Sequence, residues 1–323
     1  MSRYVRNTAV QAKIETTYGT EASGFTATDA VLIAEATYGE VQVNVPRNLL
    51  RPYFGASEEL QVTGRRTIRL LVEFASSGTA GTAPAWGALL RACGFAQTII
   101  ATTAAVFTPI STLQESVTIR YFEDGILHTC VGCRGTASLR MMAFDKPMIE
   151  FNLEGLDTVA STATALPATD FTAYKKPLVA TFANAVMLSL GATYAAGTGV
   201  ISGGVNLASR GLEVNLGNAV SHIQLFTGES IDLTNREVTG RTTNFLTAAE
   251  EVTWRAAIRA NTLAAVGFQL GSAAGSIIGV YGGAVQRTDP AGEDYEGRKM
   301  LGTGVRFLPV GTSGNDEIRI IAR

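Results

Sequence analysis

Three residues in one short segment have the spacing of a metal or redox site. His128, Cys130 and Cys133 lie within the sequence HTCVGC, and a Cys-x-x-Cys pair can hold zinc or exchange thiol and disulfide forms. A closed zinc site needs four ligands, yet the third thiol, Cys93, falls on the apolar face of an expected helix. We therefore predict that the cysteines are small buried side chains and that no metal or other cofactor is bound.

Other catalytic arrangements are equally poorly supported. A nucleophilic serine or cysteine needs a neighbouring base, and neither His128 nor His222 lies near a nucleophile-elbow pattern. The glycine-containing runs 282–284 and 302–304 lack the lysine and spacing of a phosphate-binding loop, so we expect tight turns or close backbone packing there. The charged run 293–299 is expected to be a solvated loop. The sequence thus predicts a protein that is not an enzyme.

The composition favours packing against other protein over binding of nucleic acid. Charged residues make up 17% of the 323 residues, against roughly a quarter in an average soluble domain. Residues 1–160 contain 13 basic and 15 acidic side chains, and residues 161–323 contain 13 of each. Neither half is therefore a basic body that would grip phosphate backbones.

No segment has the features of a membrane span or a secretion signal. The uncharged stretches 177–209 and 260–286 contain repeated Gly, Asn, Ser or Thr and fall short of the roughly 20 predominantly apolar residues of a span. Lys13 and Glu15 interrupt the N-terminal region. The odd number of cysteines, three, agrees with a reducing compartment. We expect the chain to be made in the cytoplasm.

Alternating apolar and polar residues predict a mainly β protein. The pattern is strongest at 68–74 and 149–154, where every second side chain is apolar. Weaker strands are expected at 30–38, 116–122, 126–131, 136–142, 186–193, 211–216, 229–234, 276–285, 303–308 and 316–322.

Two helices are expected to flank these strands. Trp86, Leu89, Leu90 and Cys93 have helical spacing, with Thr82 as the expected cap and a stop at the following glycine. A second helix is expected over 248–265, with Trp254 on its apolar face. Both tryptophans of the chain thus lie on helices that would pack against a sheet.

An internal repeat predicts two tandem domains. Four short matches occur in the same order in both halves, with loops of different length between them. They pair 36–38 with 192–194, 43–44 with 214–215, 62–65 with 238–241, and the helix at Trp86 with the helix at Trp254. The segment 158–176, rich in Ala, Thr and Pro, has the composition of a linker. We therefore expect one domain at 1–157 and its copy at 177–323.

A long connection at 45–66 carries the residues that we expect to contact other subunits. Apolar side chains on a projecting segment stay in water unless a partner covers them, although a loop folded over its own sheet remains the alternative. The expected contact residues are Arg47, Leu49, Leu50, Arg51, Tyr53, Phe54, Arg65 and Arg66, together with Arg241, the counterpart of Arg65 in the repeat.

Several segments resemble the tail tube proteins of long-tailed bacteriophages. The resemblance is densest over 10–155 and rests on KIETTYGT at 13–20, the arginine-bearing loop before VTGR at 62–65, GTAPAWGALLRACGF at 81–95, and Asp124-Gly125, His128 and GCRG at 132–135. It implies two tandem tail-tube-like β-sandwich or barrel domains, each with a flanking α-helix. It also implies a structural role without catalysis, in the virion tail.

The resemblance further implies the partners of the chain. A ring of this family carries six tube domains, so a chain with two domains would form trimeric rings with pseudo-sixfold symmetry, with a hexamer as the alternative. The rings would stack into a tube that conducts DNA without sequence-specific binding, and would meet the tape measure, terminator and distal tail proteins. The competing interpretation is a distal tail or baseplate hub component that uses the same domain.

Overall fold

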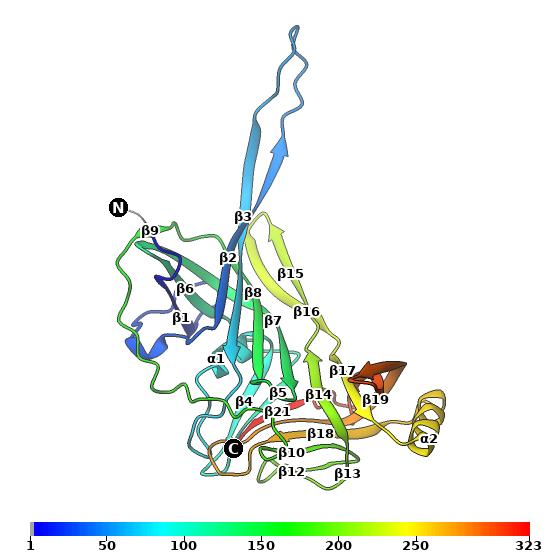
Figure 1. Ribbon diagram of the computed structural model, residues 1–323. Coiled ribbons are helices and arrows are strands. Elements are labelled where there is room, and N and C mark those ends of the chain that lie inside the picture. Colours follow the sequence, from blue (N-terminus) through cyan, green and yellow to red (C-terminus); the bar gives the residue numbers. More distant parts are fainter. Residues whose placement is uncertain (1–2) are drawn as a thin grey trace.

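Antiparallel strands make up most of the regular structure, as the sequence predicted (Figure 1). The computed structural model describes residues 3–323. The elements up to residue 163 are β1 (Thr8–Ile14), a short 3-10 helix (Ala27–Asp29), β2 (Glu35–Pro46), β3 (Glu59–Glu73), α1 (Gly87–Ala92), β4 (Phe95–Ile100), β5 (Ala104–Pro109), β6 (Val117–Glu123), β7 (Ile126–Met142), β8 (Met148–Leu156) and β9 (Thr162–Ala163). The later elements are β10 (Ala185–Leu190), β11 (Thr193–Ala195), β12 (Val200–Ser202), β13 (Val205–Asn206), β14 (Ala208–Asn215), β15 (Asn218–Leu225), β16 (Gly228–Arg236), β17 (Thr239–Phe245), α2 (Ala248–Arg259), β18 (Ala264–Leu270), β19 (Ile278–Tyr295), β20 (Arg298–Leu308) and β21 (Arg319–Ala322).

Two series of six antiparallel strands run through the molecule. In the first series the neighbours are β1, β6, β7, β8, β3 and β2, in that order. In the second series they are β10, β18, β19, β20, β17 and β14. The pair β14 with β7 joins the two series. β21 pairs with β19 and with β5, and so adds the β4–β5 hairpin to the second series. One large sheet therefore extends through both halves of the chain.

The two strongest predicted strands are confirmed, and two weaker ones merge. Residues 68–74 of β3 and 149–154 of β8 alternate in burial as their sequence pattern requires. The predicted strands 126–131 and 136–142 form the single strand β7, because a bulge between Val131 and Arg134 accommodates the extra residues without ending the strand.

Some predicted bounds and loops were wrong. The strand expected from residue 30 begins only at Glu35, and the strand expected at 186–193 divides into β10 and β11. The glycine-containing runs 282–284 and 302–304 lie inside β19 and β20, and the charged run 293–299 forms the end of their hairpin. Local composition indicated turns there, but cross-strand pairing keeps these glycines and charged residues in the ladder.

Both predicted helices exist with different limits. α1 starts after Trp86, which has helical backbone angles and no side-chain cap, so Thr82 is not the cap that we expected. α2 begins after Thr247, whose side chain and that of Glu250 cap each other's backbone N–H. It ends at residue 259 rather than 265, because Asn261 has a φ of 52° and the chain then enters β18.

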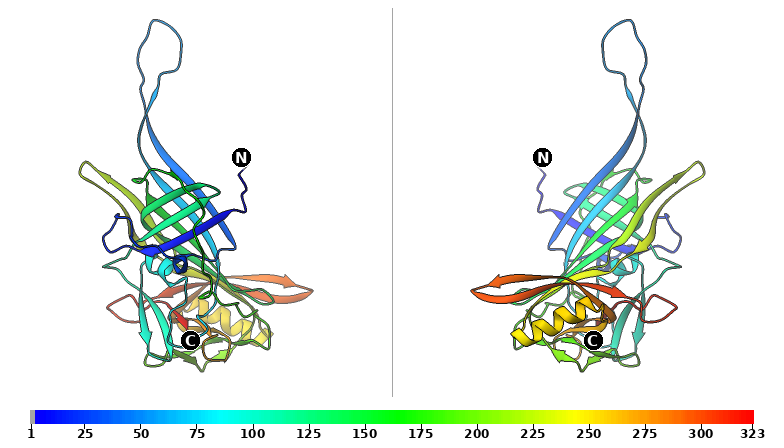
Figure 2. Two further views of the ribbon diagram at one scale, coloured as in Figure 1. Left: turned by 90° about the vertical axis from the view of Figure 1, so that its left-hand side faces the viewer. Right: turned by 90° about the vertical axis from the view of Figure 1, so that its right-hand side faces the viewer.

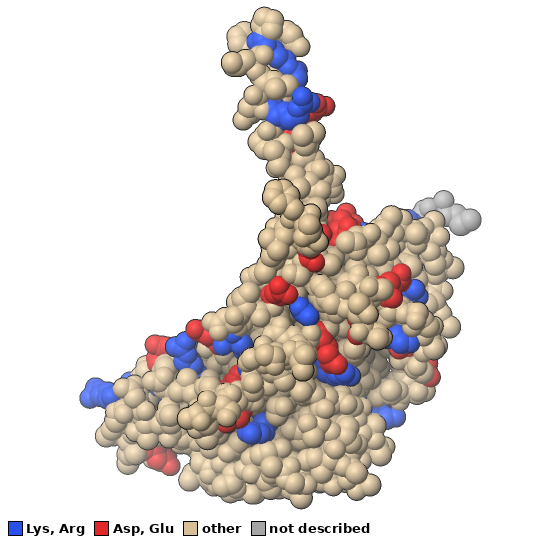
Figure 3. Space-filling model, turned by 180° about the vertical axis from the view of Figure 1, so that it is seen from behind, with Lys and Arg blue, Asp and Glu red and all other residues tan. Residues whose placement is uncertain are grey.

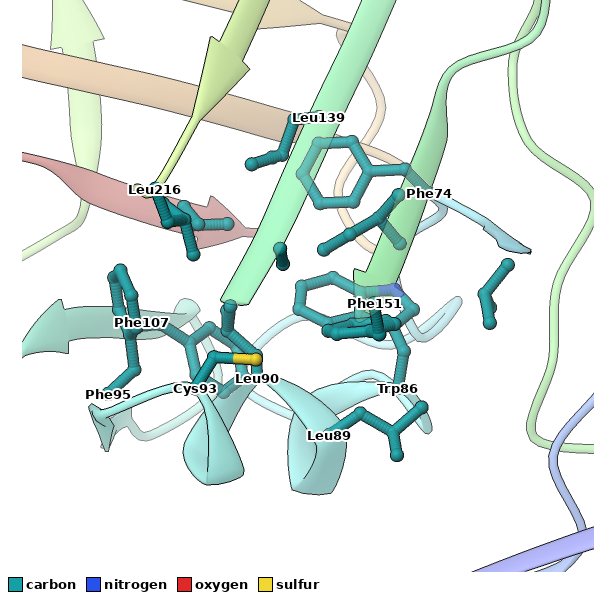
Figure 4. Packing of buried hydrophobic residues seen from close by; sticks show 14 of the residues in the cluster. Phe74, Trp86, Leu89, Leu90, Cys93, Phe95, Phe107, Leu139, Phe151 and Leu216 are labelled. Carbon is teal, nitrogen blue, oxygen red and sulfur yellow. The ribbon is translucent and has the colours of Figure 1, made fainter. Parts of the chain in front are cut away.

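The main hydrophobic core draws on both halves of the chain (Figure 4). Trp86 is buried between Phe74 and Phe107, with ring centroids 5.2 and 5.3 Å away, and its indole N–H donates to the carbonyl of Ala75 at 2.8 Å. Leu216, which follows β14, belongs to the same cluster. The two halves are thus packed together by apolar burial as well as by strand pairing.

The segment expected to be a linker, 158–176, contains little regular structure. Its one strand, β9, pairs with the start of β7. The tyrosine near its end, Tyr174, packs against the main core. The limits 1–157 and 177–323 for two domains therefore remain a prediction, since pairing and packing also connect the halves.

Two hairpins project from the body of the molecule. β2 and β3 form a long arm that rises from one end, and β19 with β20 forms a ribbon that extends sideways (Figure 2). Strands β10, β12 and β13 lie at the end opposite the arm (Figure 1). None of the helices in the described part of the chain is long and apolar enough to cross a membrane.

Candidate assembly surfaces

The expected loop at 45–66 is the outer part of the β2–β3 arm. β2 and β3 stay paired as far as Pro46 and Glu59, so only residues 47–58 form the tip. The expectation of a long irregular connection was wrong for 45–46 and 59–66, because their backbone groups pair across the hairpin. The arm also does not fold over its own sheet (Figure 1).

The arm is apolar and uncovered. Leu50 and Phe54 at its tip are fully exposed, and Leu49 and Tyr53 are 48% and 64% exposed. Its strands add five exposed aliphatic side chains: Val41, Val43, Val45, Leu60 and Val62. A contiguous exposed apolar surface of this kind is typical of a protein contact site.

The arginines of the predicted contact set have different surroundings. Arg47 forms an ion pair with Glu58 across the tip, and Arg65 lies 3.0 Å from Glu154. No carboxylate between residues 3 and 323 forms an ion pair with Arg51. Figure 3 shows basic side chains near the end of the arm. Arg51 is therefore the charge of this set that is available to a partner.

Arg66, which was also predicted to contact another subunit, is buried within its own chain. Its side chain is 3% exposed, and its guanidinium donates to the carbonyls of Thr129 and Val159 at 2.7 and 2.8 Å and to Asp157 at 2.5 Å. Alternation along β3 turns Arg66 inward and Arg65 outward. Arg66 thus fixes the root of the arm to its own fold.

Arg241 lies on β17 and pairs with Glu293 of β19 across the intervening strand β20. The pair passes over Gly302, where a Cβ would overlap both side chains. Hydrogen bonding to Arg241 lowers the pKa of the Glu293 carboxyl below its usual range. Arg241, half exposed at the surface, thus already has a carboxylate partner within the chain.

The strand predicted at 229–234 is confirmed as part of β16, but the sequence reasoning missed β15 and the hairpin that the two strands form beside the arm. Leu225 and Phe226 at its turn are 72% and 111% exposed. Gln224 of this hairpin donates to the hydroxyl of Thr63 in β3, so the two hairpins lie side by side (Figure 1). The signal that could have located it is the pair of alternating runs on either side of Thr227-Gly228.

A second missed feature is an apolar depression at the end opposite the arm. Phe144 and Phe182 at its rim are 78% and 100% exposed, and Met141, Leu188 and Phe268 lie deeper in it. Phe144 has a φ of 62°, which is unusual for an aromatic residue and costs backbone energy. Like the arm, this depression presents apolar side chains without a partner.

The residues that resembled a metal or redox site are packed as ordinary core and surface groups. Cys93, Cys130 and Cys133 are free and fully buried, and burial raises the pKa of the Cys93 and Cys133 thiols. His128 stacks on Tyr38 with ring centroids 4.3 Å apart and hydrogen-bonds Ser161 at 2.8 Å. Between residues 3 and 323 no three His, Cys, Asp or Glu side chains are grouped to hold a metal.

An extensive β sheet with projecting apolar hairpins and an uncovered apolar depression is typical of a structural subunit that packs against other protein. Residues 6–308 match the family model described as phage tail tube protein. The chain belongs to this family, whose members are structural proteins of the virion tail and not enzymes. A search of curated proteins finds no match.

Proposed function

We propose that this chain closes into rings of three copies that stack into the hollow tube of a phage tail, through which DNA is ejected. The observation that carries the proposal is the identical order of the two strand series, with α1 after β3 and α2 after β17. Two equivalent tube domains in one chain give a three-copy ring six similar units, and a heterologous contact that closes by rotation forms such a ring. A ring of six chains is the alternative stoichiometry.

The sequence repeat supports this duplication in part. Segments 62–65 and 238–241 lie at the matching strands β3 and β17, and Trp86 and Trp254 lie at the matching helices. Segments 43–44 and 214–215 fall on the matching strands β2 and β14. Residues 193–194 of the segment 192–194 lie in β11, whose one partner strand in the described part of the chain is β12. β11 has no place in the series, so the likeness of this segment to 36–38 carries no weight.

The two apolar surfaces give the stacking of rings a physical basis. The arm, with Leu50 and Phe54 at its tip, projects from one end (Figure 1). The depression with Phe144 and Phe182 is lined by residues of β10 and β13, and these strands lie at the other end. Head-to-tail stacking brings the arm of one ring toward the next ring, where burial of these side chains stabilises the contact.

The charge of the chain suits the passage of DNA. The formal net charge is −2, and a wall without a basic stripe lets a polyanion slide instead of binding it. Assembly from chains made in the host bacterial cytoplasm, and contacts with the tape measure, terminator and distal tail proteins, complete the proposed role.

Negative-stain electron microscopy of the concentrated protein tests this proposal. Long hollow tubes are the expected result, and analytical ultracentrifugation at rising concentration should show trimers and larger polymers. Isolated rings that never stack would instead support a distal tail or baseplate hub component. A strictly monomeric species at high concentration would contradict both functions.

A further inference from the structure

We infer that β2 of one copy pairs with the free edge of β19 in the next copy, in the way that β14 pairs with β7 inside each chain. The inference rests on the proposed ring and names the strands that join its subunits. Four observations carry it: the internal pairing, the matching edge of β19, the matching edge of β2, and the place of both edges at the ends of one strand series.

The internal pairing of β14 with β7 is antiparallel, from Gly211 opposite Met142 to Asn215 opposite Ser138. β8 pairs with residues 131–140 of β7. This range includes residues of β7 that also pair with β6 and residues that also pair with β14. A strand has two edges, and β8 occupies one of them. β6 and β14 therefore follow each other along the other edge of β7.

β19 repeats this arrangement with one strand missing. β18 covers residues 278–285 on one edge, while β21 and then β20 cover the other edge as far as Tyr295. β20 overlaps β18 at Val285, which places these two on opposite edges. Within residues 3–323, no strand pairs with the β18 edge beyond Val285. This vacant stretch corresponds to the stretch of β7 that β14 occupies.

β2 is the counterpart of β14 in the strand order and lacks the matching partner. β14 has β17 on one edge and β7 on the other, whereas β2 pairs with β3 alone among the strands of residues 3–323. The vacant edge of β2 is 12 residues long and carries no lysine, and its one proline, Pro46, is its last residue. Proteins usually protect such an edge with charge, proline or a covering segment. The two charges of β2, Glu35 and Glu40, precede Val41, and the stretch 41–45 carries neither charge nor proline, so this stretch is suited to pairing with another chain.

The two vacant edges lie at opposite ends of a single series of pairings. It runs β2, β3, β8, β7, β14, β17, β20 and β19, and it contains the β14–β7 junction near its middle. The β19–β20 ribbon extends away from the body, so its edge is accessible to a neighbour (Figure 2). A contact between different edges of identical chains is heterologous and closes a ring by rotation. Three internal and three intermolecular junctions then alternate around the ring.

The internal junction also indicates which residues meet. Along β7, the pairing with β6 ends at Cys133 and the pairing with β14 begins five residues later, at Ser138. The same spacing after Val285 of β19 leads to the segment from Pro290 onward. In β2 the matching segment is centred on Val41, which pairs with Arg65 as Glu213 pairs with Arg241. Pairing of these segments satisfies backbone donors and acceptors that are otherwise left to water.

Engineered cysteines test the pairing in assembled tubes. Gln42→Cys on β2 is combined in one chain with Ala291→Cys, Gly292→Cys or Asp294→Cys on β19, and all four sites are exposed. Cα atoms of paired antiparallel strands lie about 4.5–5.5 Å apart, within disulfide range. The native cysteines are buried and contribute little background. Gln42→Cys with Thr112→Cys, which is on an exposed loop, is the matched control.

Mild oxidation followed by a non-reducing gel gives the result. We expect covalent dimers and trimers from at least one β2–β19 combination, at about ten or more times the yield of the control. Tubes that form normally while no β2–β19 combination cross-links above the control overturn this inference and leave the proposed function intact. Failure of the unmodified chain to form rings or tubes overturns the proposed function and the inference with it.

Discussion

The guanidinium of Arg66 lies 2.5 Å from the carboxylate of Asp157, and this contact fastens the root of the projecting arm to the end of β8. Arg51, on the same arm, is exposed and has no carboxylate partner in the described chain. Two arginines of one hairpin thus have opposite roles, one inside the subunit and one at its surface.

Replacement of Arg66 by methionine is expected to destabilise the folded chain strongly. It leaves the buried carbonyl of Thr129 and the carboxylate of Asp157 without their donor, and breaking a buried ion pair typically costs about 3–5 kcal/mol of unfolding free energy. Urea denaturation measures the change. Arg51→Met is the control and should unfold like the wild type. Equal midpoints for the two variants would show that Arg66 does not anchor the arm.

Polar substitution at the tip of the arm is expected to abolish tubes while leaving the subunit stable. Leu50→Ser with Phe54→Ser removes apolar side chains that are fully exposed in the subunit, so its unfolding free energy should change by less than about 0.5 kcal/mol. Electron microscopy should show loss of stacking. Leu113→Ser, at an exposed loop residue of the body, is the control. A parallel loss of subunit stability would mean that the arm packs on its own domain.

The Arg241–Glu293 pair predicts a pH-dependent contribution to stability. Arg241 lowers the pKa of the Glu293 carboxyl in the folded state, so the stabilisation is fully present above the ordinary glutamate pKa of about 4.3 and is lost as the pH falls through the lower folded-state pKa. We therefore expect Glu293→Gln to be less stable than the wild type at neutral pH, with the difference shrinking below about pH 4. Urea melts at several pH values measure this difference. A constant difference across this range would refute the assigned role of Arg241.

The two tryptophans should respond differently to replacement by phenylalanine. Trp86→Phe removes the donor to the Ala75 carbonyl in the main core, and a buried acceptor left unpaired costs about 1–3 kcal/mol. Trp254→Phe keeps an aromatic ring near Arg287, whose guanidinium lies 4.7 Å from the tryptophan ring, and should cost less than about 1 kcal/mol. Urea melts of both variants provide the comparison. The reverse ranking would show that α2 contributes more than α1 to the packing of the fold.

Much of the local structure was predictable from the sequence. Alternation at 68–74 and 149–154 identified β3 and β8, and helical spacing beside Trp86 and Trp254 identified the two helices. The apolar residues around Leu50 and Phe54 indicated an uncovered surface. These properties depend on side-chain periodicity and composition within a few consecutive residues, which a single sequence displays directly.

The tertiary structure decided how distant segments meet. Arg65 and Arg66 are adjacent and of the same type, yet only Arg66 lies on the buried face of β3. Asp157 and two backbone carbonyls converge on its guanidinium there. The sequence alone determined a mainly β chain of the tail tube type with an exposed apolar arm. Only the structure showed that β14 pairs with β7 and that β2 and β19 each have a vacant edge. Strands pair through backbone hydrogen bonds, and these depend little on the side chains by which one sequence differs from another.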